Sequence, residues 1–397
     1  MTIDTAVVLA AGEGRRLRPL TANRPKPMLP AGTRPILEYV FDALIDAGVE
    51  DLNVVVGYRR DRVQDHFGPT YRGRPITYHV QRKQLGSGHA LSCARDAVDG
   101  EFLVVNGDEV VAADVIRSVA DAHTDADACT LAVLESTDAP LYGAVRLDGD
   151  TVVELVEKPG SGSYRLLNAG VYAFRPEFFD RIDATERDEG ELALTDPISS
   201  AVADGAHVRG VKVDGRHSKV TFPWDLPELA ATLLADGMAG DDPDGRGASV
   251  AAAATVSPDA TLYPPVVVAA DAVVEPGAVV GPDAAVGRNA TVESGAVVRR
   301  SVLDTDARVG ANATVVDSVL GRGAAVGEGA TAPGGPADIR VDDRVHVGEQ
   351  LGCVLGDRAR LGGGSTVVPG VLVGPNARVD PGSVLRRNVD ADAEVRD

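Results

Sequence analysis

The sequence predicts two folds in one chain: an α/β domain with a doubly wound, mixed sheet, followed by a parallel β-coil with a period of six. Two observations support this prediction. Residues 1–236 alternate strand-like and helix-like hydrophobic patterns, and the residues beyond about 250 repeat an aliphatic side chain at every sixth position. With 397 residues the chain is also too long for one typical core, so two domains are expected.

The α/β domain is expected to span residues 1–236. Apolar runs predict its strands at residues 3–10, 52–56, 76–80, 102–105 and 129–134. Helical patterns occupy residues 36–45, 86–97 and 111–123, and the first of them ends at Gly48. Parallel strands need such helical crossovers, which predicts a doubly wound sheet. Residues 145–153 predict a hairpin with Asp148 and Gly149 at its turn, so the sheet should be mixed.

A polar, glycine-rich stretch at residues 237–250 is predicted to be a linker, and residues 251–397 to form the second domain. There, eight aliphatic residues follow one another at an unbroken spacing of six: Val256, Leu262, Val268, Val274, Val280, Val286, Val292 and Val298. Small residues, mainly alanine, come four positions after them. The register slips and resumes at Val309, and a last run starts at Leu355. Residues 331–354 break the repeat and are expected to form an excursion loop.

Neither a helix nor an ordinary strand has a period of six, whereas a triangular coil with one side per hexapeptide does. The aliphatic residue would point inward on each side, and small residues would fit the corners. This pattern resembles the hexapeptide-repeat left-handed parallel β-helix. Because β-helices of this kind commonly trimerise along their flat faces, we expect a trimer-based homo-oligomer assembled through this domain.

The charge of the chain argues against several functions. The formal net charge is −20, which is unsuited to binding nucleic acid or an anionic membrane. No apolar run approaches the roughly 18 residues of a membrane span, and the first residues continue into a strand rather than a signal peptide. We therefore expect a cytoplasmic protein.

The acidic excess accompanies a scarcity of lysine. The chain has five lysines among its 39 basic residues, and the others are arginines. A GC-rich genome would explain the arginines alone, whereas a surface adapted to high salt explains both features, so we hypothesise a halophilic source. The three cysteines, Cys93, Cys129 and Cys353, are scattered and suggest neither a disulfide framework nor a zinc site.

Residues 9–30 carry the strongest functional signal. They join the end of a strand to a glycine turn that is followed by Arg15, Arg16 and Lys26. The backbone N–H groups of such a turn can bind an anion, and the cationic side chains add countercharge. The usual triphosphate loop is absent, because no glycine here is followed by a basic residue and then a hydroxyl. The dinucleotide fingerprint also fails, at Leu17.

The run L-A-A-G-E-G-R-R-L-R-P-L-T, with P-K-P-M-L-P close behind it, resembles the signature of sugar-1-phosphate nucleotidylyltransferases. Within that family the chain resembles archaeal glucose-1-phosphate thymidylyl- and uridylyltransferases and the bifunctional N-acetylglucosamine-1-phosphate uridylyltransferases. The resemblance implies a Rossmann-like fold of the nucleotide-diphospho-sugar transferase type. It also implies Mg²⁺-dependent transfer of a nucleotidyl group from UTP or dTTP to glucose 1-phosphate or N-acetylglucosamine 1-phosphate, with release of pyrophosphate.

The resemblance also implies which residues bind the nucleotide. Arg16 would grip the β- and γ-phosphates and Lys26 would reach the phosphates at the reacting centre, so both are catalytic candidates. Gln81 can present a donor and an acceptor to a pyrimidine edge, whereas His89 is expected to pack in its helix. The other nucleotide-binding candidates lie in the glycine turn and in the segment Q-L-G-S-G-H-A: Leu9, Ala11, Gly12, Gly14, Gly86 and Ser87.

Carboxylates that hold Mg²⁺ are expected as well, because the reaction brings two anions together. Asp108, in N-G-D at the end of a buried strand, matches the family's metal ligand. Asp225, in F-P-W-D, fits the second ligand but could instead cap the following helix. Ligation by oxygen atoms alone suits Mg²⁺. The sugar 1-phosphate is expected to contact residues of three further blocks, Y-G, E-K-P and N-A-G: Gly143, Glu157, Lys158 and Asn168.

Two other functions stay open. The β-helix could acetylate glucosamine 1-phosphate, as in the bifunctional family, which by resemblance needs a histidine and a nearby tyrosine followed by asparagine and lysine. The comparable stretch has Ala311 and Thr314, the only histidine in this half is His346, and no lysine follows Lys219. We therefore expect an assembly or regulatory module. A non-catalytic regulatory homologue is the third possibility, but such proteins lose the arginine, lysines and metal carboxylates that are intact here.

Overall fold

The structure, a computed structural model, describes residues 3–136, 139, 143–157, 159, 164–188, 190–214, 217–238, 247–342 and 344–396. The chain divides into two compact units. The first unit contains residues 1–13, 25–28 and 36–219, and the second contains residues 14–24, 29–35 and 220–397. Residues 14–24, which we call the arginine-rich loop, therefore belong to the same unit as the repeats. The sequence-based domain boundaries stay a prediction.

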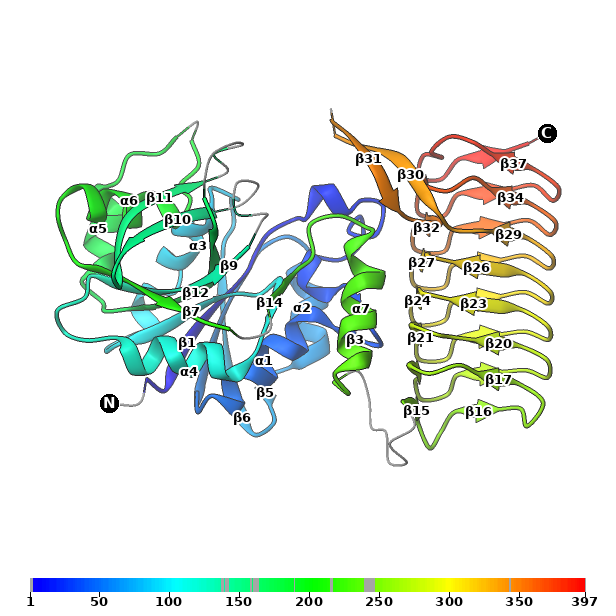
Figure 1. Ribbon diagram of the computed structural model, residues 1–397, viewed down its shortest axis with the longest axis horizontal. Helices are drawn as coiled ribbons and strands as arrows, with labels where there is room; N and C mark the ends of the chain where they lie inside the picture. The colour runs from blue at the N-terminus through cyan, green and yellow to red at the C-terminus, as the bar shows by residue number, and fades with distance from the viewer. Residues whose placement is uncertain are drawn as a thin grey trace. The chain divides into compact units, whose positions relative to one another are not determined.

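The first unit is built on a ten-stranded mixed sheet (Figure 1). In spatial order its strands are β10 (Gly143–Asp148), β11 (Thr151–Glu157), β13 (Val208–Lys212), β9 (Cys129–Glu135), β12 (Leu166–Phe174), β7 (Phe102–Asn106), β1 (Thr5–Ala10), β4 (Asp51–Val56), β6 (Arg74–Val80) and β5 (Thr70–Tyr71). Strand β1 pairs in parallel with β4 and β7, and β4 with β6. Strand β12 runs antiparallel between β7 and β9. The hairpin predicted at residues 145–153 is present as β10 and β11.

Helices cover both faces of this sheet, which confirms the predicted doubly wound α/β class. They are α1 (Ile36–Asp46), α2 (Arg60–Phe67), α3 (Ser87–Ser92), α4 (Ala113–Ala122), α5 (Phe178–Ala184) and α6 (Thr195–Ala203), with the 3-10 turns η2 (Lys26–Met28) and η3 (Arg95–Ala97). The apolar residues of α1, α2 and α4 pack in one core, against one set of alternate strand residues. Those of α3, α5 and α6 pack in a second core, against the other set.

The second unit contains a left-handed parallel β-helix of three sheets, as the six-residue repeat predicts (Figure 1). The first sheet consists of β15 (Ala248–Val250), β18 (Val266–Val268), β21 (Ala284–Val286), β24 (Ser301–Leu303), β27 (Val319–Leu320), β32 (Cys353–Leu355) and β35 (Val371–Val373). The second consists of β16 (Thr255–Val256), β19 (Val273–Val274), β22 (Thr291–Val292), β25 (Arg308–Val309), β28 (Ala325–Val326), β33 (Arg360–Leu361), β36 (Arg378–Val379) and β38 (Glu394–Val395). The third consists of β17 (Thr261–Leu262), β20 (Val279–Val280), β23 (Val297–Arg299), β26 (Thr314–Val316), β29 (Thr331–Ala332), β34 (Thr366–Val367) and β37 (Val384–Leu385).

The interior of the coil is filled by the repeated valines and by the alanines that follow them. Val274, Val280, Ala278 and Ala290 are all essentially inaccessible to solvent. At most corners of the coil the residue just before the alanine lies in the left-handed backbone region, and it is usually glycine, asparagine or aspartate, as at Asn289 with φ 55°. The sequence slip also has a structural basis: strand partners are 18 residues apart at first, but 17 apart where β22 pairs with β25.

The excursion from the coil is an ordered antiparallel hairpin, β30 (Pro336–Val341) with β31 (Arg344–Gln350). The strands just before and after it, β29 and β32, still pair with the coil. The unit also contains η1 (Arg15–Leu17), the short pair β2 (Pro30–Ala31) and β3 (Arg34–Pro35), and α7 (Asp225–Ala235), which contacts β21 and β24 of the coil. None of the described helices is long and apolar enough to cross a membrane.

Candidate active site

In the first unit, four parallel strands end at the same edge of the sheet, and three of them are followed there by predicted site residues. Ala11 follows β1, Gln81 follows β6, and Asp108 comes two residues after β7, while β4 ends just before Gly57. The carboxyl edge of a parallel sheet is where α/β proteins bind their ligands. The fold therefore brings Ala11, Gln81 and the candidate metal ligand Asp108 to one edge.

Lys26 and Asp108 form an ion pair at this edge. Lys26 Nζ lies 2.5 Å from Asp108 Oδ2, although the two residues are far apart in sequence. Lys26 is 8% exposed and lies in η2, between Pro25 and Pro27. The Asp108 side chain is 30% exposed, so this carboxylate is reachable from solvent. An ammonium and a carboxylate in this arrangement can bind a metal–phosphate group jointly.

A buried ionic cluster, which the sequence analysis missed, lies beside this pair. Glu109 is 1% exposed, and it binds Lys219 Nζ at 2.6 Å and His217 Nε2 at 3.0 Å. Burial alone would raise the pKa of Glu109, but Lys219 and His217 hold that pKa well below its usual range. Burial likewise opposes the charge of Lys219, whose pKa is raised by Glu109 and Asp108. Because lysine is rare in this chain, the position of Lys219 is the sequence feature that could have pointed to this cluster.

The glycine turn is fixed through its backbone carbonyl groups. Leu9 O accepts a hydrogen bond from the N–H of Gly107 at 2.9 Å. Ala11 O accepts from Tyr58 N–H at 3.2 Å and from Gln84 Nε2 at 3.1 Å. A β-carbon placed on Gly12 would have no atom within 4 Å, so this part of the turn is open.

Gln81 lines a cleft of about 590 Å³ in the first unit, together with Gly57, Tyr58, Arg60, Val80, Arg82 and Gln84. Its amide nitrogen lies 3.0 Å from Gly86 O and 2.9 Å from His89 Nδ1. Gly86 O can only accept, which assigns the amide nitrogen to that side. Burial, and to a lesser extent Arg187, lowers the pKa of His89, so this ring is neutral and its Nδ1 accepts the second N–H. The Gln81 carbonyl oxygen is the group left to accept from a ligand.

Gly86 and Ser87 pack against the segment that precedes α6. Gly86 has φ 91°, and a β-carbon there would lie 2.2 Å from Leu192 O, so only glycine fits. Ser87 Oγ accepts a hydrogen bond from Leu194 N–H at 2.8 Å. The Q-L-G-S-G turn is therefore held in one conformation next to Gln81.

Three of the four sugar-phosphate candidates come together on neighbouring strands. Gly143 begins β10 and pairs with Glu157 at the end of β11. A β-carbon on Gly143 would lie 3.2 Å from Asn168 Cβ and 3.4 Å from Glu157 Oε2. The Asn168 amide donates to Tyr172 Oη at 2.8 Å. The fourth candidate, Lys158, lies outside the described residues.

The remaining candidates, Gly14, Arg16 and Asp225, belong to the second unit. Gly14 has φ 69°, and its carbonyl oxygen accepts from Thr21 Oγ1 at 2.9 Å. The Arg16 guanidinium lies 5.6 Å from the ring centroid of Phe222. Asp225 is the first residue of α7, and its Oδ2 accepts backbone N–H groups at 2.6 and 2.8 Å, from Thr221 and Phe222 respectively. It therefore orders the F-P-W-D turn and is not the helix cap, which is Trp224.

Arg24 fixes the other end of the arginine-rich loop. Its guanidinium lies 2.5 Å from Asp304 Oδ2 and 2.6 Å from Asp357 Oδ1, and all three residues are less than a tenth exposed. Burial opposes the charge of Arg24, but the two carboxylates outweigh it and raise the Arg24 pKa. The sequence analysis did not identify this contact, because the partners are about 300 residues away.

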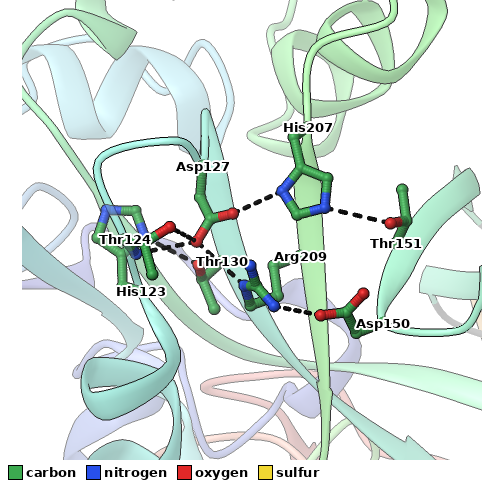
Figure 2. Close-up of polar contacts among 8 residues, drawn as sticks. All are labelled: His123, Thr124, Asp127, Thr130, Asp150, Thr151, His207 and Arg209. Carbon is green, nitrogen blue, oxygen red and sulfur yellow. Dashed lines mark hydrogen bonds and ion pairs between the residues drawn. The ribbon is translucent and has the colours of Figure 1, made fainter.

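Another buried carboxylate of the first unit lies at the opposite edge of the sheet (Figure 2). Asp127 precedes β9 and is fully buried; it binds His207 Nδ1 at 2.6 Å and Arg209 Nε at 3.1 Å. Thr124 donates to Asp127 Oδ2 through both its N–H and its hydroxyl, each at 2.9 Å. These residues, which we call the Asp127 network, tie the start of β9 to the start of β13.

The donor chemistry fits a magnesium ion. Within the described part of the chain, no three histidine, cysteine, aspartate or glutamate side chains form a group that could hold a metal. Mg²⁺ needs fewer protein ligands, because it is often held by one or two carboxylates together with phosphate oxygens and water. Asp108 in the first unit and Asp225 in the second each carry a carboxylate of this kind.

Family models match both parts of the chain. The model described as nucleotidyl transferase matches residues 5–218, and the model described as GMPPB C-terminal domain matches residues 262–368.

Some known proteins are similar to the first part of this chain, and others to nearly its whole length. UTP–glucose-1-phosphate uridylyltransferase AglF of Haloferax volcanii is 36% identical over 233 residues, covering 57% of this chain and 96% of AglF. Bifunctional protein GlmU of Methanocaldococcus jannaschii is 30% identical over 410 residues, covering 98% of this chain and 97% of GlmU. The crystal structure of a UDP-glucose pyrophosphorylase with UDP-glucose has a TM-score of 0.54 at 20% identity, covering 59% of this chain and 99% of that one, a likeness of fold.

Proposed function

Because the chain belongs to the nucleotidyl transferase family, as a sugar-1-phosphate nucleotidylyltransferase, we propose that it transfers the nucleotidyl group of UTP or dTTP to glucose 1-phosphate or N-acetylglucosamine 1-phosphate. A phosphate oxygen of the sugar 1-phosphate attacks the α-phosphorus of the triphosphate. The bond from that phosphorus to the bridging oxygen breaks, and pyrophosphate leaves with its electron pair. No covalent intermediate with the protein is needed.

The observation that carries this proposal is the meeting of Lys26 and Asp108 at the carboxyl edge of the sheet. Two anionic substrates repel each other, so the site has to supply positive charge where they meet. Lys26 would contact the phosphates at the reacting centre, and Arg16 the β- and γ-phosphates. Asp108 and Asp225 would hold Mg²⁺, which, when bound, neutralises charge on the phosphate oxygens.

The orientation of Gln81 is consistent with UTP or dTTP as the nucleotide and argues against CTP and ATP. Both N–H donors of its amide are directed to Gly86 O and His89 Nδ1, so the amide offers a carbonyl oxygen to the base. Uracil and thymine present an N3–H that this oxygen can accept. Cytosine and adenine present a ring nitrogen with a lone pair at the corresponding position, and two acceptors repel. Leu9, Ala11, Gly12, Gly14, Gly86 and Ser87 would shape the rest of the nucleotide site through their backbone.

The convergence of Gly143, Glu157 and Asn168 supports a sugar site. Glu157 would accept hydrogen bonds from sugar hydroxyls, and the Asn168 amide would contact the ring or its 2-substituent. The lack of a side chain at Gly143 lets Glu157 and Asn168 approach this position closely. Lys158 would pair with the sugar phosphate.

A matrix assay tests the proposal. Glucose 1-phosphate, N-acetylglucosamine 1-phosphate, galactose 1-phosphate and mannose 1-phosphate are each combined with UTP, dTTP, CTP and ATP in the presence of Mg²⁺, and pyrophosphate release is measured. We expect turnover with UTP or dTTP and one of the first two sugars. Turnover with CTP or ATP alone would contradict the assignment of the base.

A second activity, acetylation of glucosamine 1-phosphate, is favoured by the full-length match to a bifunctional protein. The residues of the coil argue against it. Ala311 and Thr314 stand where the family plan needs histidine and tyrosine, and no lysine occurs in this half. We therefore expect no consumption of acetyl-CoA with glucosamine 1-phosphate, and a rate comparable to nucleotidyl transfer would restore the bifunctional assignment.

Two further features belong to the proposal. The β-helix would assemble the chain into a trimer-based homo-oligomer, and light scattering that gives the mass of one chain would refute this.

The net charge of −20 with few lysines would reflect adaptation to high salt. Circular dichroism should then show loss of structure when salt is dialysed away, and full structure at low ionic strength would exclude the adaptation.

A further inference from the structure

Three aromatic rings meet in the second unit, and we call them the aromatic cluster: Phe222, Trp224 and His346. The Phe222 and Trp224 rings stack with centroids 4.7 Å apart and planes 8° apart. The His346 ring lies 4.3 Å from the Phe222 centroid and 5.1 Å from that of Trp224. Phe222 and Trp224 precede α7, whereas His346 comes from the β31 strand of the hairpin, more than a hundred residues later.

The hairpin that carries His346 is anchored to the coil at its base. Gln350 Nε2 donates to Asp317 Oδ2 at 2.7 Å, and Arg300 Nε binds the other oxygen of this carboxylate at 2.5 Å. Ile339 of the opposite strand is 1% exposed and packs at Gly370, where a β-carbon would lie 3.2 Å from Ile339 Cγ1. The hairpin therefore presents His346 from a defined position.

The aromatic cluster is joined to two candidate site residues through Phe222. The guanidinium of Arg16 lies 5.6 Å from the Phe222 centroid, within range of a cation–π interaction. The backbone N–H of Phe222 donates to Asp225 Oδ2 at 2.8 Å. A displacement of Phe222 would consequently disturb both the guanidinium and the carboxylate.

We propose that His346 is a positioning residue for nucleotidyl transfer: the hairpin of the β-helix places its ring against Phe222 and Trp224 and so fixes Arg16 and Asp225. The proposal rests on the proposed function, because the roles of Arg16 with the triphosphate and Asp225 with Mg²⁺ come from there. In this proposal the hairpin formed by β30 and β31 contributes to nucleotidyl transfer, whereas no such role is assigned to the repeats of the coil. The β-helix thereby supplies a side chain on which the site depends.

The test uses the full chain with three substitutions, His346→Ala, His346→Phe and Val347→Ala. His346→Ala removes the ring, and His346→Phe keeps an aromatic ring that can pack on the pair. Val347 is the matched control, since side chains alternate along a strand and Val347 is 76% exposed on the same β31. KM for UTP, the Mg²⁺ concentration that gives half-maximal rate, and kcat are measured for each protein.

We expect His346→Ala to raise KM for UTP and the Mg²⁺ requirement by about 3–10-fold, with kcat changed less than about twofold. His346→Phe should restore most of the loss, and Val347→Ala should resemble the wild type. Trp224 is the only tryptophan of the chain, so its fluorescence reports on the cluster directly. Acrylamide should quench Trp224 more strongly in His346→Ala than in the other proteins.

An unchanged KM in His346→Ala, or the same rise in Val347→Ala, would overturn the positioning role while the wild type stays active. A loss of thermal stability without a change in KM would also overturn it, because the ring would then be merely structural. Absence of turnover by the wild type with every pair of substrates would instead overturn the proposed function, and the positioning role with it.

Discussion

The two edges of the sheet in the first unit each place a carboxylate beside a cationic side chain, yet the two carboxylates differ in exposure and in role. At the carboxyl edge Asp108 is partly exposed and faces the ammonium of Lys26, beside the buried Glu109 cluster. At the amino edge Asp127 is fully buried and its oxygens are bound by Thr124, His207 and Arg209 (Figure 2). A carboxylate enclosed by protein donors can only hold the fold together. One that faces both a cation and solvent can also bind a ligand.

The strongest test of this contrast is the change Asp108→Asn. It keeps the size of the side chain but removes the charge, and we expect kcat/KM for nucleotidyl transfer to fall about 100- to 1,000-fold. The melting temperature should fall less than in Asp127→Asn, because the Asp108 side chain is 30% exposed and the amide oxygen of the variant can still accept from Lys26. The matched control is Asp121→Asn, which alters an exposed residue of α4. A kcat/KM within twofold of the wild type would contradict the role of Asp108.

The reverse outcome is expected for Asp127→Asn. The neutral amide no longer forms an ion pair with the Arg209 guanidinium, so the free energy of unfolding should fall by about 2–3 kcal/mol. KM and kcat, measured well below the melting temperature, should stay at wild-type values. Urea unfolding followed by circular dichroism gives the first quantity. A large loss of activity in the folded variant would show that the Asp127 network does more than hold the fold.

A smaller effect is expected at Gln81, through His89→Ala. Loss of the Nδ1 acceptor frees the Gln81 amide to rotate, so the ratio of kcat/KM for UTP to that for CTP should fall about 3–10-fold. The control is His66→Ala, on the exposed side of α2. The pKa of His89 is lowered from 6.5, so in the wild type the same fall should appear only as the pH drops below 6.5. A constant ratio across that range would contradict this role of His89.

The smallest effect concerns the pH dependence of stability. Burial alone would raise the pKa of Asp127, but its hydrogen bonds, chiefly from Arg209 and His207, lower it below 3.8. A lowered pKa means that the ionised carboxylate stabilises the fold at neutral pH and that this contribution is lost as the pH falls through the folded-state value. The stability difference between the wild type and Asp127→Asn should therefore be constant above about pH 5 and shrink in more acidic solution.

The sequence predicted those features that depend on local periodicity. The spacing of six from Val256 to Val298 led to the coil, because each repeat buries one aliphatic side chain. The strand that ends before Gly107 and Asp108 placed a carboxylate at the carboxyl edge of the sheet, as the structure shows. Such signals lie within a few residues, where the chemistry of the side chains determines the backbone.

The contacts that the sequence could not predict join residues far apart in the chain. The pairing of Arg24 with Asp304 depends on how an entire coil is placed, and so does the packing of His346 on Trp224. The assignment of the Gln81 amide needed the position of Gly86 O, which no spacing determines. The excursion at residues 331–354 was predicted as a loop, but the antiparallel pairing of its two strands was not.

Isotope labelling tests the central claim, nucleotidyl transfer at the carboxyl edge, most directly. The protein is incubated with Mg²⁺, glucose 1-phosphate or N-acetylglucosamine 1-phosphate, and UTP or dTTP labelled at either the α- or the γ-phosphorus. The account predicts that the α label appears in a nucleotide sugar and the γ label in pyrophosphate, and that both products require the sugar phosphate. Release of the γ label as orthophosphate, or of the α label as a free nucleoside monophosphate, would contradict it.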